Sequence, residues 1–339
     1  MQTITLKNPF DMHLHLREDI ILESVLPFSA RTFLGGVVMP NLKNPVSTAE
    51  DAIQYKNQIQ NICPDFYPLM TIYITPTLDE SELKKAKDLG IKILKLYPKG
   101  ATTNSSNGVD DILDSKMLKL LEIAQDMDFI LSIHGESNGF SLDREYEFLS
   151  IFEFLAKKYK KLKIVLEHMS DHRSIKILED YENLFGTLTL HHITLDLDSL
   201  LGKGLSPHYF CKPILKTPKD REKLLELALN AHPKISFGSD SAPHTLENKL
   251  KDNAAAGIFS APYLLESLIE LFDKNHALEN LQKFISDNAF KNYALDSKDF
   301  VEKTLTFYKK PCQIVEKVTT KDGQTIIPMH ANKMLSWSL

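Results

Sequence analysis

The chain is poor in cysteine. Its 339 residues include three cysteines, Cys63, Cys211 and Cys312, and no two of them have Cys-x-x-Cys spacing. An odd number of widely separated thiols excludes a disulfide framework and indicates a reducing compartment, so the cytoplasm is the expected location. The same spacing argues against a zinc site built on cysteines.

Long apolar runs and long basic runs are also absent. No apolar run approaches the roughly 18 residues of a membrane span, and residues 1–7 lack the basic and apolar regions of a signal peptide. A net charge of -5 without a basic run argues against a dedicated nucleic-acid binder. Because no Pro/Gly/Ser-rich linker and no repeat divides the chain, we expect one soluble domain over residues 1–339, without a membrane or nucleic-acid partner.

The composition is sufficient for a large core, since 43% of the residues are hydrophobic and 25% are charged. Eight short runs that are apolar almost throughout predict strands at 9–16, 33–39, 67–74, 91–96, 129–134, 163–168, 186–191 and 234–238. Amphipathic stretches between them predict helices at 49–62, 81–89, 115–127, 145–158, 175–181 and 220–231. This alternation is typical of a parallel sheet covered by helices. It predicts an α/β fold, a (β/α)8 TIM barrel with a C-terminal helical extension after about residue 258.

The first predicted strand contains the most informative run, DMHLHLR at residues 11–17. Alternate side chains of a strand share a face, so His13, His15 and Arg17 point the same way. Two neutral imidazoles are good ligands for zinc, and the guanidinium can bind an anionic group in a bidentate fork. A half-exposed strand with its polar residues turned to water explains the run equally well when it is taken alone.

Polar residues close the other predicted strands too, and active-site residues of a barrel gather at the C-terminal ends of its strands. The residues concerned are Asn41, Lys95, His134, His168 and Asp240, with His244 shortly after. Their spacing is close to multiples of a ~30-residue βα unit. Each has an ordinary explanation by itself, but their coincidence at the strand ends indicates one site. The other histidines are expected to be ordinary polar residues: His172, His191, His192, His208, His232, His276 and His330.

Lys95 is the least ordinary member of this set. It alternates in phase with Ile91 and Ile93, so its side chain should face inward with theirs. A buried ammonium without a partner is costly. An inward Lys95 therefore needs a partner or must lose its proton.

Together these residues resemble the dihydroorotases of the amidohydrolase superfamily, specifically the shorter bacterial type that consists of the barrel alone. A His-x-His pair by itself indicates the superfamily, whereas the combination of motifs is specific. The motifs span residues 11 to about 262 and include DMHLHLRE at 11–18, MPN at 39–41, KLYP at 95–98, ATTNS at 101–105, HGE at 134–136, EH at 167–168, HYFCKPILK at 208–216 and GSDSAPH at 238–244.

The resemblance implies a binuclear zinc centre. Lys95 would be carboxylated by carbon dioxide, and its carbamate would bridge both ions together with a hydroxide. The carbamate would replace a costly inward ammonium by a bidentate anion paired with metal. The remaining ligands would be His13, His15 and Asp240 for one ion, and His134 and His168 for the other.

The resemblance also implies a reaction and an assembly. The reaction is the reversible cyclisation of N-carbamoyl-L-aspartate to (S)-dihydroorotate and water, a step of pyrimidine synthesis. The metal-bridging hydroxide would be the nucleophile in the hydrolytic direction, with Asp240 as general base and acid, and the protein would be a homodimer. The substrate contacts would be His15 and His134 beside the metals, Arg17, Asn41 and His244 at the carboxylate, Lys212 and Ala256 through the main chain, and Thr102 and Thr103 on a lid.

Three alternatives remain at this point. Residues 135–139 match the G-x-S-x-G elbow of serine hydrolases, with Asp240 and His244 following in the order of such a triad, although no helical pattern starts directly after Ser137. A dihydropyrimidinase or hydantoinase would share the metal site but would need no grip on a carboxylate. A barrel that has lost catalysis and serves as a scaffold would be expected to lack at least one ligand or the base.

Overall fold

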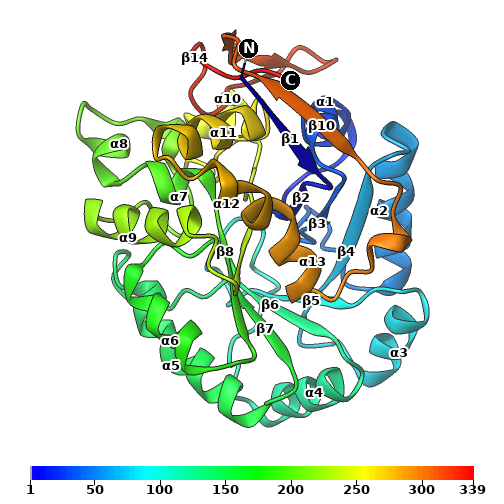
Figure 1. Ribbon diagram of the computed structural model, residues 1–339. Helices are drawn as coiled ribbons and strands as arrows, with labels where there is room; N and C mark the ends of the chain where they lie inside the picture. The colour runs from blue at the N-terminus through cyan, green and yellow to red at the C-terminus, as the bar shows by residue number, and fades with distance from the viewer. Residues whose placement is uncertain (1) are drawn as a thin grey trace.

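A computed structural model describes residues 2–339, and its centre is a sheet of eight parallel strands that follow one another in chain order (Figure 1). All eight are short and largely buried, as apolar strands with helices on the outside should be. They are β2 (Phe10–Leu14), β3 (Gly35–Val38), β4 (Tyr67–Tyr73), β5 (Ile93–Leu96), β6 (Ile130–Ile133), β7 (Lys163–Leu166), β8 (Leu184–Leu188) and β9 (Ile235–Phe237).

The sheet curves round until its first strand meets the segment that follows its last. Leu14 forms an isolated parallel bridge with Ser241, and the Asp240 amide donates to the His13 carbonyl at 2.8 Å. A Cβ added to Gly238 would lie 2.9 Å from the Cβ of His13, so this close approach requires glycine. The predicted (β/α)8 barrel is therefore confirmed, and its seam carries the candidate ligands of β2 beside those after β9.

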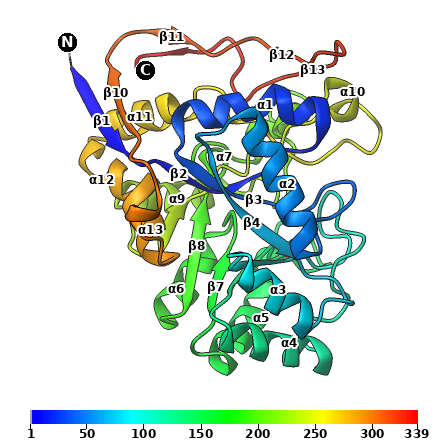
Figure 2. The ribbon, with the colours of Figure 1, turned by 90° about the vertical axis from the view of Figure 1, so that its right-hand side faces the viewer.

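Helices surround the sheet (Figures 1 and 2). The Thr48 side chain and Asp51 form a capping box at the start of α2, which begins and ends where the sequence pattern predicts. The other predicted helices differ from the observed ones by at most two residues at either end. The helices that alternate with the strands are α1 (Asp19–Thr32), α2 (Ala49–Ile62), α3 (Glu80–Asp88), α4 (Ser115–Asp126), α5 (Arg144–Lys158), α6 (Ile175–Asp180), α7 (Leu190–Thr194), α8 (Leu197–Leu201) and α9 (Pro218–Leu229).

Within the barrel, the sequence patterns do not predict helices α1, α7 and α8, and one predicted strand is displaced. Helix α1 is absent from the predicted set; it contains Pro27, a residue that usually ends or kinks a helix. The strand predicted at 186–191 ends at Leu188, and His191 lies in α7 instead. Thr189 caps that helix by accepting a hydrogen bond from the His192 amide, which ends the extended backbone.

The chain after the barrel is helical at first. It contains α10 (Leu246–Lys249), α11 (Leu264–Lys274), α12 (Leu278–Gln282), a π-helical turn (Lys283–Asp287) and α13 (Asn288–Asn292). The predicted helical extension ends there, because short strands follow: β10 (Thr304–Tyr308), β11 (Cys312–Gln313), β12 (Val318–Thr319), β13 (Thr325–Ile326) and β14 (Met334–Leu335). Strand β10 pairs antiparallel with β1 (Thr3–Lys7), which brings the two ends of the chain together in Figure 1.

None of the helices within residues 2–339 combines the length and the apolar character that crossing a membrane requires.

Candidate active site

Three of the predicted ligands meet where β2 and the end of β9 come together. The Nε2 atoms of His13 and His15 lie 3.4 Å and 3.0 Å from Oδ1 of Asp240. All three side chains are buried, and their ligand atoms lie within 4.8 Å of one another. Burial lowers the pKa of both imidazoles, so both are neutral at physiological pH and have a lone pair available for a metal.

The other two predicted histidines follow β6 and β7. Nδ1 of His134 lies 3.1 Å from Nε2 of His168, and the His168 ring centroid is 4.9 Å from that of His13, so the two groups of ligands are adjacent. His168 and Asp240 both have positive φ angles, 41° and 42°. Such backbone costs about 1–3 kcal/mol for a residue with a Cβ and is common at functional sites. Here it turns both side chains towards the mouth of the barrel.

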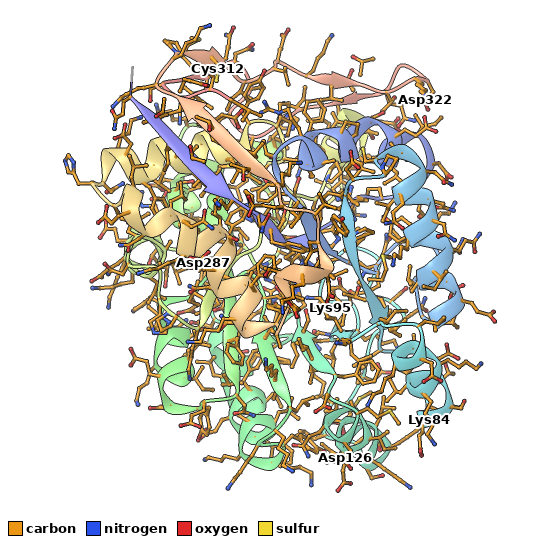
Figure 3. The ribbon with its side chains drawn as sticks, turned by 45° about the vertical axis from the view of Figure 1, so that its right-hand side comes forward. Lys84, Lys95, Asp126, Asp287, Cys312 and Asp322 are labelled. Carbon is orange, nitrogen blue, oxygen red and sulfur yellow. The ribbon has the colours of Figure 1, made fainter. Side chains whose placement is uncertain are left out.

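Lys95 on β5 faces inward, as its phase in the strand predicts. Its side chain has no exposed surface, and its Nζ has no hydrogen-bond partner among residues 2–339. Figure 3 labels it in the interior of the molecule. The Nζ lies 5.1 Å from the centre of the Tyr97 ring, and burial lowers the pKa of the ammonium to about 8. A buried amine without a partner is expected to be completed by a further group.

The residues present fit a bound metal ion. Neutral imidazoles and a carboxylate are the nitrogen and oxygen ligands that zinc prefers. The buried Nζ of Lys95, which has no partner within residues 2–339, fits a further group at this site.

Buried carboxylates orient two of the imidazoles, a role that the sequence motifs do not reveal. Oε2 of Glu167 lies 2.8 Å from Nδ1 of His13, and Oε2 of Glu136 lies 2.8 Å from Nε2 of His134. A carboxylate accepts a hydrogen bond, so each fixes the ring tautomer and leaves the other nitrogen free for a metal. Asp11 acts on the backbone instead: its Oδ1 accepts from the amides of His13 and Ser239 and joins the two strands at the seam.

Glu167 stays ionised although it is buried. Burial alone would raise its pKa, but His13, Lys95 and hydrogen bonding outweigh burial and lower the pKa to about 2. Its two oxygens also accept from the Ser132 hydroxyl at 2.5 Å and the Thr187 hydroxyl at 2.6 Å. A buried negative charge therefore stands behind the histidines, surrounded by donors.

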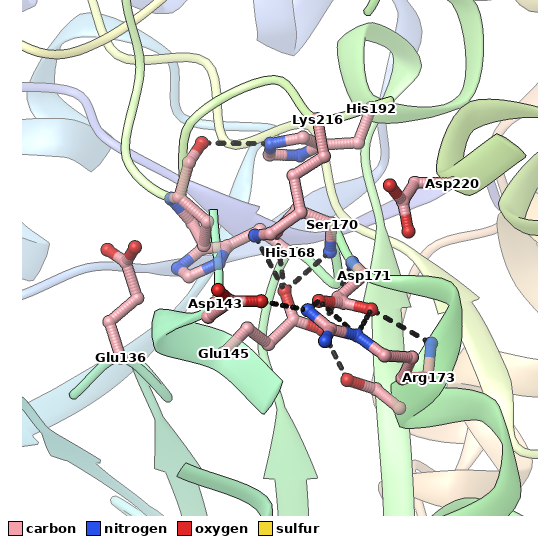
Figure 4. Close-up of polar contacts among 12 residues, drawn as sticks. Glu136, Asp143, Glu145, His168, Ser170, Asp171, Arg173, His192, Lys216 and Asp220 are labelled. Carbon is pink, nitrogen blue, oxygen red and sulfur yellow. Dashed lines mark hydrogen bonds and ion pairs between the residues drawn. The ribbon is translucent and has the colours of Figure 1, made fainter. Parts of the chain in front are cut away.

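A second polar network supports the segment that carries His168 (Figure 4). Lys216 is buried, and its Nζ donates to the Ser170 hydroxyl at 2.5 Å. Ser170 in turn donates to Oε2 of Glu145 at 2.5 Å, and the Ser170 amide donates to the same oxygen. The turn after β7 is thus held in place by side chains of α5 and of the segment before α9.

The residues expected to bind the substrate carboxylate lie on one side of the ligands. Nη2 of Arg17 is 3.0 Å from Nε2 of His244, and Nε of Arg17 donates to the Pro243 carbonyl at 3.1 Å. Nδ2 of Asn41 donates to the Thr103 carbonyl at 3.0 Å. The Oδ1 of Asn41 is buried and has no hydrogen-bond partner within the described part of the chain.

The segment that carries Thr102 and Thr103, which the resemblance predicts to be a lid, contacts the opposite side of the cavity. The Thr103 hydroxyl donates to the Ala256 carbonyl at 3.2 Å across the mouth of the barrel, and the remaining cavity measures about 20 Å³. A pocket for a small organic ligand needs about 300 Å³ or more, so the cavity as it stands is too small for a substrate. The cavity wall contains the predicted residues His13, His15, Arg17, Asn41, Thr102, Thr103, His134, His168, Lys212, Asp240 and Ala256, together with Tyr97, Ala242 and Gly257.

The serine-hydrolase alternative does not fit this geometry. Helix α5 begins at Arg144, so Ser137 does not stand on a strand-to-helix elbow. The Ser137 hydroxyl donates to Glu147 and is not paired with a histidine in the described residues.

A barrel with histidines, a lysine and an aspartate at its strand ends is the arrangement of a metal-dependent amidohydrolase. The sequence profile of the amidohydrolase family matches residues 10–295, and the chain belongs to this family. It is 55% identical over 339 residues to the dihydroorotase of Helicobacter hepaticus. The alignment covers 100% of this chain and 98% of that protein. Within the amidohydrolases, the chain is a member of the dihydroorotases.

Two solved structures agree with this assignment. A dihydroorotase from Campylobacter jejuni superimposes with a TM-score of 0.93 at 45% identity, covering 99% of this chain and 97% of that one. The dihydroorotase of Saccharomyces cerevisiae, solved in complex with 5-fluoroorotic acid, superimposes with a TM-score of 0.95 at 32% identity, covering 100% and 98%. The similarity spans the barrel and the C-terminal strands alike.

Proposed function

We propose that the protein interconverts N-carbamoyl-L-aspartate and (S)-dihydroorotate, with loss or addition of water, as a step of pyrimidine synthesis. One observation carries the proposal: the cluster of His13, His15 and Asp240 lies in the same small cavity as Arg17, which is paired with His244. Metal ligands and a grip for an anion thus line a single site.

The metal part of the proposal assigns two zinc ions to the site. His13, His15 and Asp240 would hold one ion and His134 and His168 the other, with a carboxylated Lys95 shared between them. When bound, such a pair supplies a hydroxide nucleophile at neutral pH and polarises the scissile carbonyl. The burial and the lowered pKa of His13, His15 and His168 support their role as neutral ligands.

The environment of its amine supports the carboxylation of Lys95. The neutral Nζ adds to the carbon of carbon dioxide and loses one proton, which leaves a carbamate with a single negative charge. The lowered pKa makes the neutral amine accessible near physiological pH. The absence of any partner for Nζ within residues 2–339 leaves the atom free to react.

Asp240 is the residue that moves the proton. Burial raises its pKa above the ordinary range of a carboxyl group, which makes its carboxylate a better proton acceptor than an exposed one. In hydrolysis it accepts the proton of the attacking hydroxide and returns it to the ring nitrogen as the C–N bond of the ring amide breaks. In the synthetic direction the same proton travels the opposite way.

Arg17, Asn41 and His244 bind the substrate carboxylate. Nε2 of His244 lies 3.0 Å from both Nη2 of Arg17 and the Ala256 carbonyl. One ring nitrogen cannot accept from the guanidinium and donate to the carbonyl at the same time. If His244 donates to the carbonyl, the Arg17 N–H lacks a good acceptor, and a carboxylate would supply it. His15 and His134 are proposed to contact the substrate at the metals, and the main chain of Lys212 and Ala256 to contact its ring.

This grip on an anion favours a dihydroorotase over a hydantoinase, whose substrates carry no such carboxylate. A spectrophotometric assay with dihydroorotate, carbamoyl aspartate and dihydrouracil tests the assignment, before and after chelation and return of zinc. Turnover of the two acidic compounds, lost on chelation, is expected. Turnover of dihydrouracil at a matching rate contradicts the assignment, and a metal content below about one equivalent in chelator-free protein would instead favour a non-catalytic scaffold.

The variant Lys95→Ala tests the metal centre directly. It should lose bound zinc and nearly all activity, because both ions lose the ligand they share. Lys92 lies on the same segment but is exposed, so Lys92→Ala is a matched control that should keep both. Normal zinc content and turnover in Lys95→Ala would show that a carbamate on Lys95 is needed neither for zinc binding nor for activity.

Two further parts of the proposal concern the cell. The resemblance to bacterial dihydroorotases supports a homodimer, and light scattering should give twice the mass of one chain. The three unpaired cysteines support a reducing compartment, the cytoplasm, and fractionation of cells that express the protein checks this location.

A further inference from the structure

Three buried side chains come together next to the active site without belonging to it. They are His191 and His192 on α7 and Cys211 in the segment before α9, with exposed fractions of 0%, 2% and 1%. One ligand atom from each lies within 4.8 Å of the other two, and the Cys211 Sγ is 3.9 Å from Nε2 of His192. None of the three has a role in the proposed reaction.

A backbone oxygen completes the group. The Pro213 carbonyl lies 3.0 Å from Nε2 of His192 and 3.2 Å from the Cys211 Sγ, and Figure 4 includes the hydrogen bond of His192. Zinc binds sulfur at about 2.3 Å and nitrogen or oxygen at about 2.0–2.2 Å, so ligand atoms around one tetrahedral ion lie about 3.2–3.8 Å apart. The separations among Cys211, His192 and Pro213 are close to that spacing, and the His191 ligand atom lies within 4.8 Å of the other two side-chain donors.

His191 is the member that the protein alone leaves unexplained. Neither of its ring nitrogens has a hydrogen-bond partner among residues 2–339, although the side chain is fully buried. Buried polar groups are costly without a partner and are rarely left so. The partly buried cluster around His172 differs, because the His172 Nδ1 pairs with Asp220 at 2.6 Å. An additional ligand is therefore indicated at His191 and not at His172.

We propose that the Cys211 thiolate, one ring nitrogen each from His191 and His192, and the Pro213 carbonyl hold a structural zinc ion that is separate from the catalytic pair. Sulfur and imidazole together are the ligands of structural zinc. On binding, the thiol loses its proton to solvent and the S–Zn bond forms, with no change of oxidation state. Because a metal ligand has to be deprotonated, binding of the ion would release a proton and depend on pH.

The position of this site indicates which part of the structure the ion would stabilise. Cys211 directly precedes Lys212, which lines the cavity, and the two histidines stand on the helix that follows β8. The ion fixes the substrate-binding segment at 211–213 to the barrel. The site is invisible to spacing rules because its histidines are adjacent and its cysteine comes 19 residues after His192, which is why the sequence argues against a cysteine-based zinc site.

Cobalt substitution tests the proposal independently of catalysis. The catalytic ligands include no sulfur, so thiolate-to-cobalt charge transfer in the near-ultraviolet spectrum reports on this site alone. Protein produced in cobalt-supplemented medium should show this absorption. Cys211→Ser should abolish it and lower the metal content by one ion per chain. The matched controls Cys63→Ser and Cys312→Ser should keep both the absorption and the metal.

The wild-type spectrum decides the matter even if Cys211→Ser fails to fold. No thiolate–cobalt absorption and at most two metal ions per wild-type chain would overturn the proposal, as would absorption that survives Cys211→Ser. His191→Gln provides a second variant, in which the absorption should weaken or disappear while all three cysteines remain. Because activity enters none of these readouts, failure here is distinguishable from failure of the proposed reaction.

Discussion

Oε2 of Glu167 lies 2.8 Å from Nδ1 of His13, and both side chains are buried. Since the carboxylate accepts this hydrogen bond, the proton of His13 is on Nδ1 and its Nε2 faces Asp240 with a free lone pair. Glu167 thereby selects the tautomer that a metal requires. It also holds the ring at a fixed angle, because Ser132 and Thr187 donate to the same carboxylate.

Glu167→Gln tests this positioning role. The amide removes the negative charge behind His13 and cannot hold the tautomer as firmly, so zinc affinity should fall about 10–100-fold. Competition with a chelator measures the affinity. With zinc in excess, KM should change little, since Glu167 does not reach the cavity. Glu153→Gln is the surface control and should leave the zinc affinity unchanged. An unchanged zinc affinity in Glu167→Gln would mean that the Glu167 carboxylate contributes to folding alone.

The barrel could be predicted from the sequence because its signal, a short run that is apolar almost throughout, is repeated eight times. Strand ends were harder to predict where a side chain ended the strand, as Thr189 does before α7. The C-terminal strands could not be predicted from their own residues: β10 is paired with β1 from the other end of the chain, and two-stranded pairing of that kind is not visible in a local pattern.

The site divides in a similar way. The placement of His13, His15 and His168 at the mouth of the barrel could be predicted because each lies at the C-terminal end of a predicted strand. Glu167 is next to His168 in the sequence, yet its role depends on His13, which lies on a different strand. Contacts between distant segments decide such roles, and a single sequence does not contain them. The position of the lid over the cavity was implied by resemblance and not by any physical pattern in residues 101–105.

Arg17→Ala should raise KM for carbamoyl aspartate. The change removes a guanidinium that makes charge-assisted hydrogen bonds with the substrate carboxylate, worth about 1.5–3 kcal/mol, so an increase of about 10- to 100-fold is expected. Bound zinc should stay at the wild-type level, because Arg17 is not a ligand. Steady-state kinetics and metal analysis check both points. An unchanged KM would mean that other residues bind the carboxylate.

Lys249 is a buried lysine that shapes the far wall of the cavity. Its Nζ donates to the carbonyls of Phe210 and Ala255 at 3.0 Å and of Gly257 at 2.8 Å. Ala256, between the last two, accepts from the lid. We expect Lys249→Met to raise KM several-fold and to keep bound zinc. The exposed Lys251→Met is the matched control, and equal KM values in the two variants would contradict the role of Lys249.

The environment of Lys249 also predicts that KM depends on pH. Burial lowers the pKa of Lys249 from 10.5 to about 8, and the neutral amine has two N–H groups for three carbonyls. KM of the wild type should therefore rise above about pH 8, whereas Lys249→Met should show no such rise from this residue. A loss of stability does not explain this rise in KM. Between about pH 8 and pH 10.5, Lys249 is protonated in the unfolded chain and mostly neutral in the folded one. Raising the pH in this range therefore increases the free energy of unfolding through this group. Denaturant titrations at pH 7 and pH 9 separate the two effects.

The lid contact between Thr103 and Ala256 should favour the closed state. Thr103→Val has nearly the same shape and lacks the hydroxyl, so it removes one hydrogen bond worth about 0.5–1.5 kcal/mol. If closure precedes the chemical step, kcat/KM should fall about two- to tenfold at unchanged zinc content. Thr77→Val, which removes a hydroxyl outside the cavity wall, is the matched control. A Thr103→Val enzyme with wild-type kcat/KM would show that the lid closes through its main chain, for which the Asn41 contact to the Thr103 carbonyl is the remaining candidate.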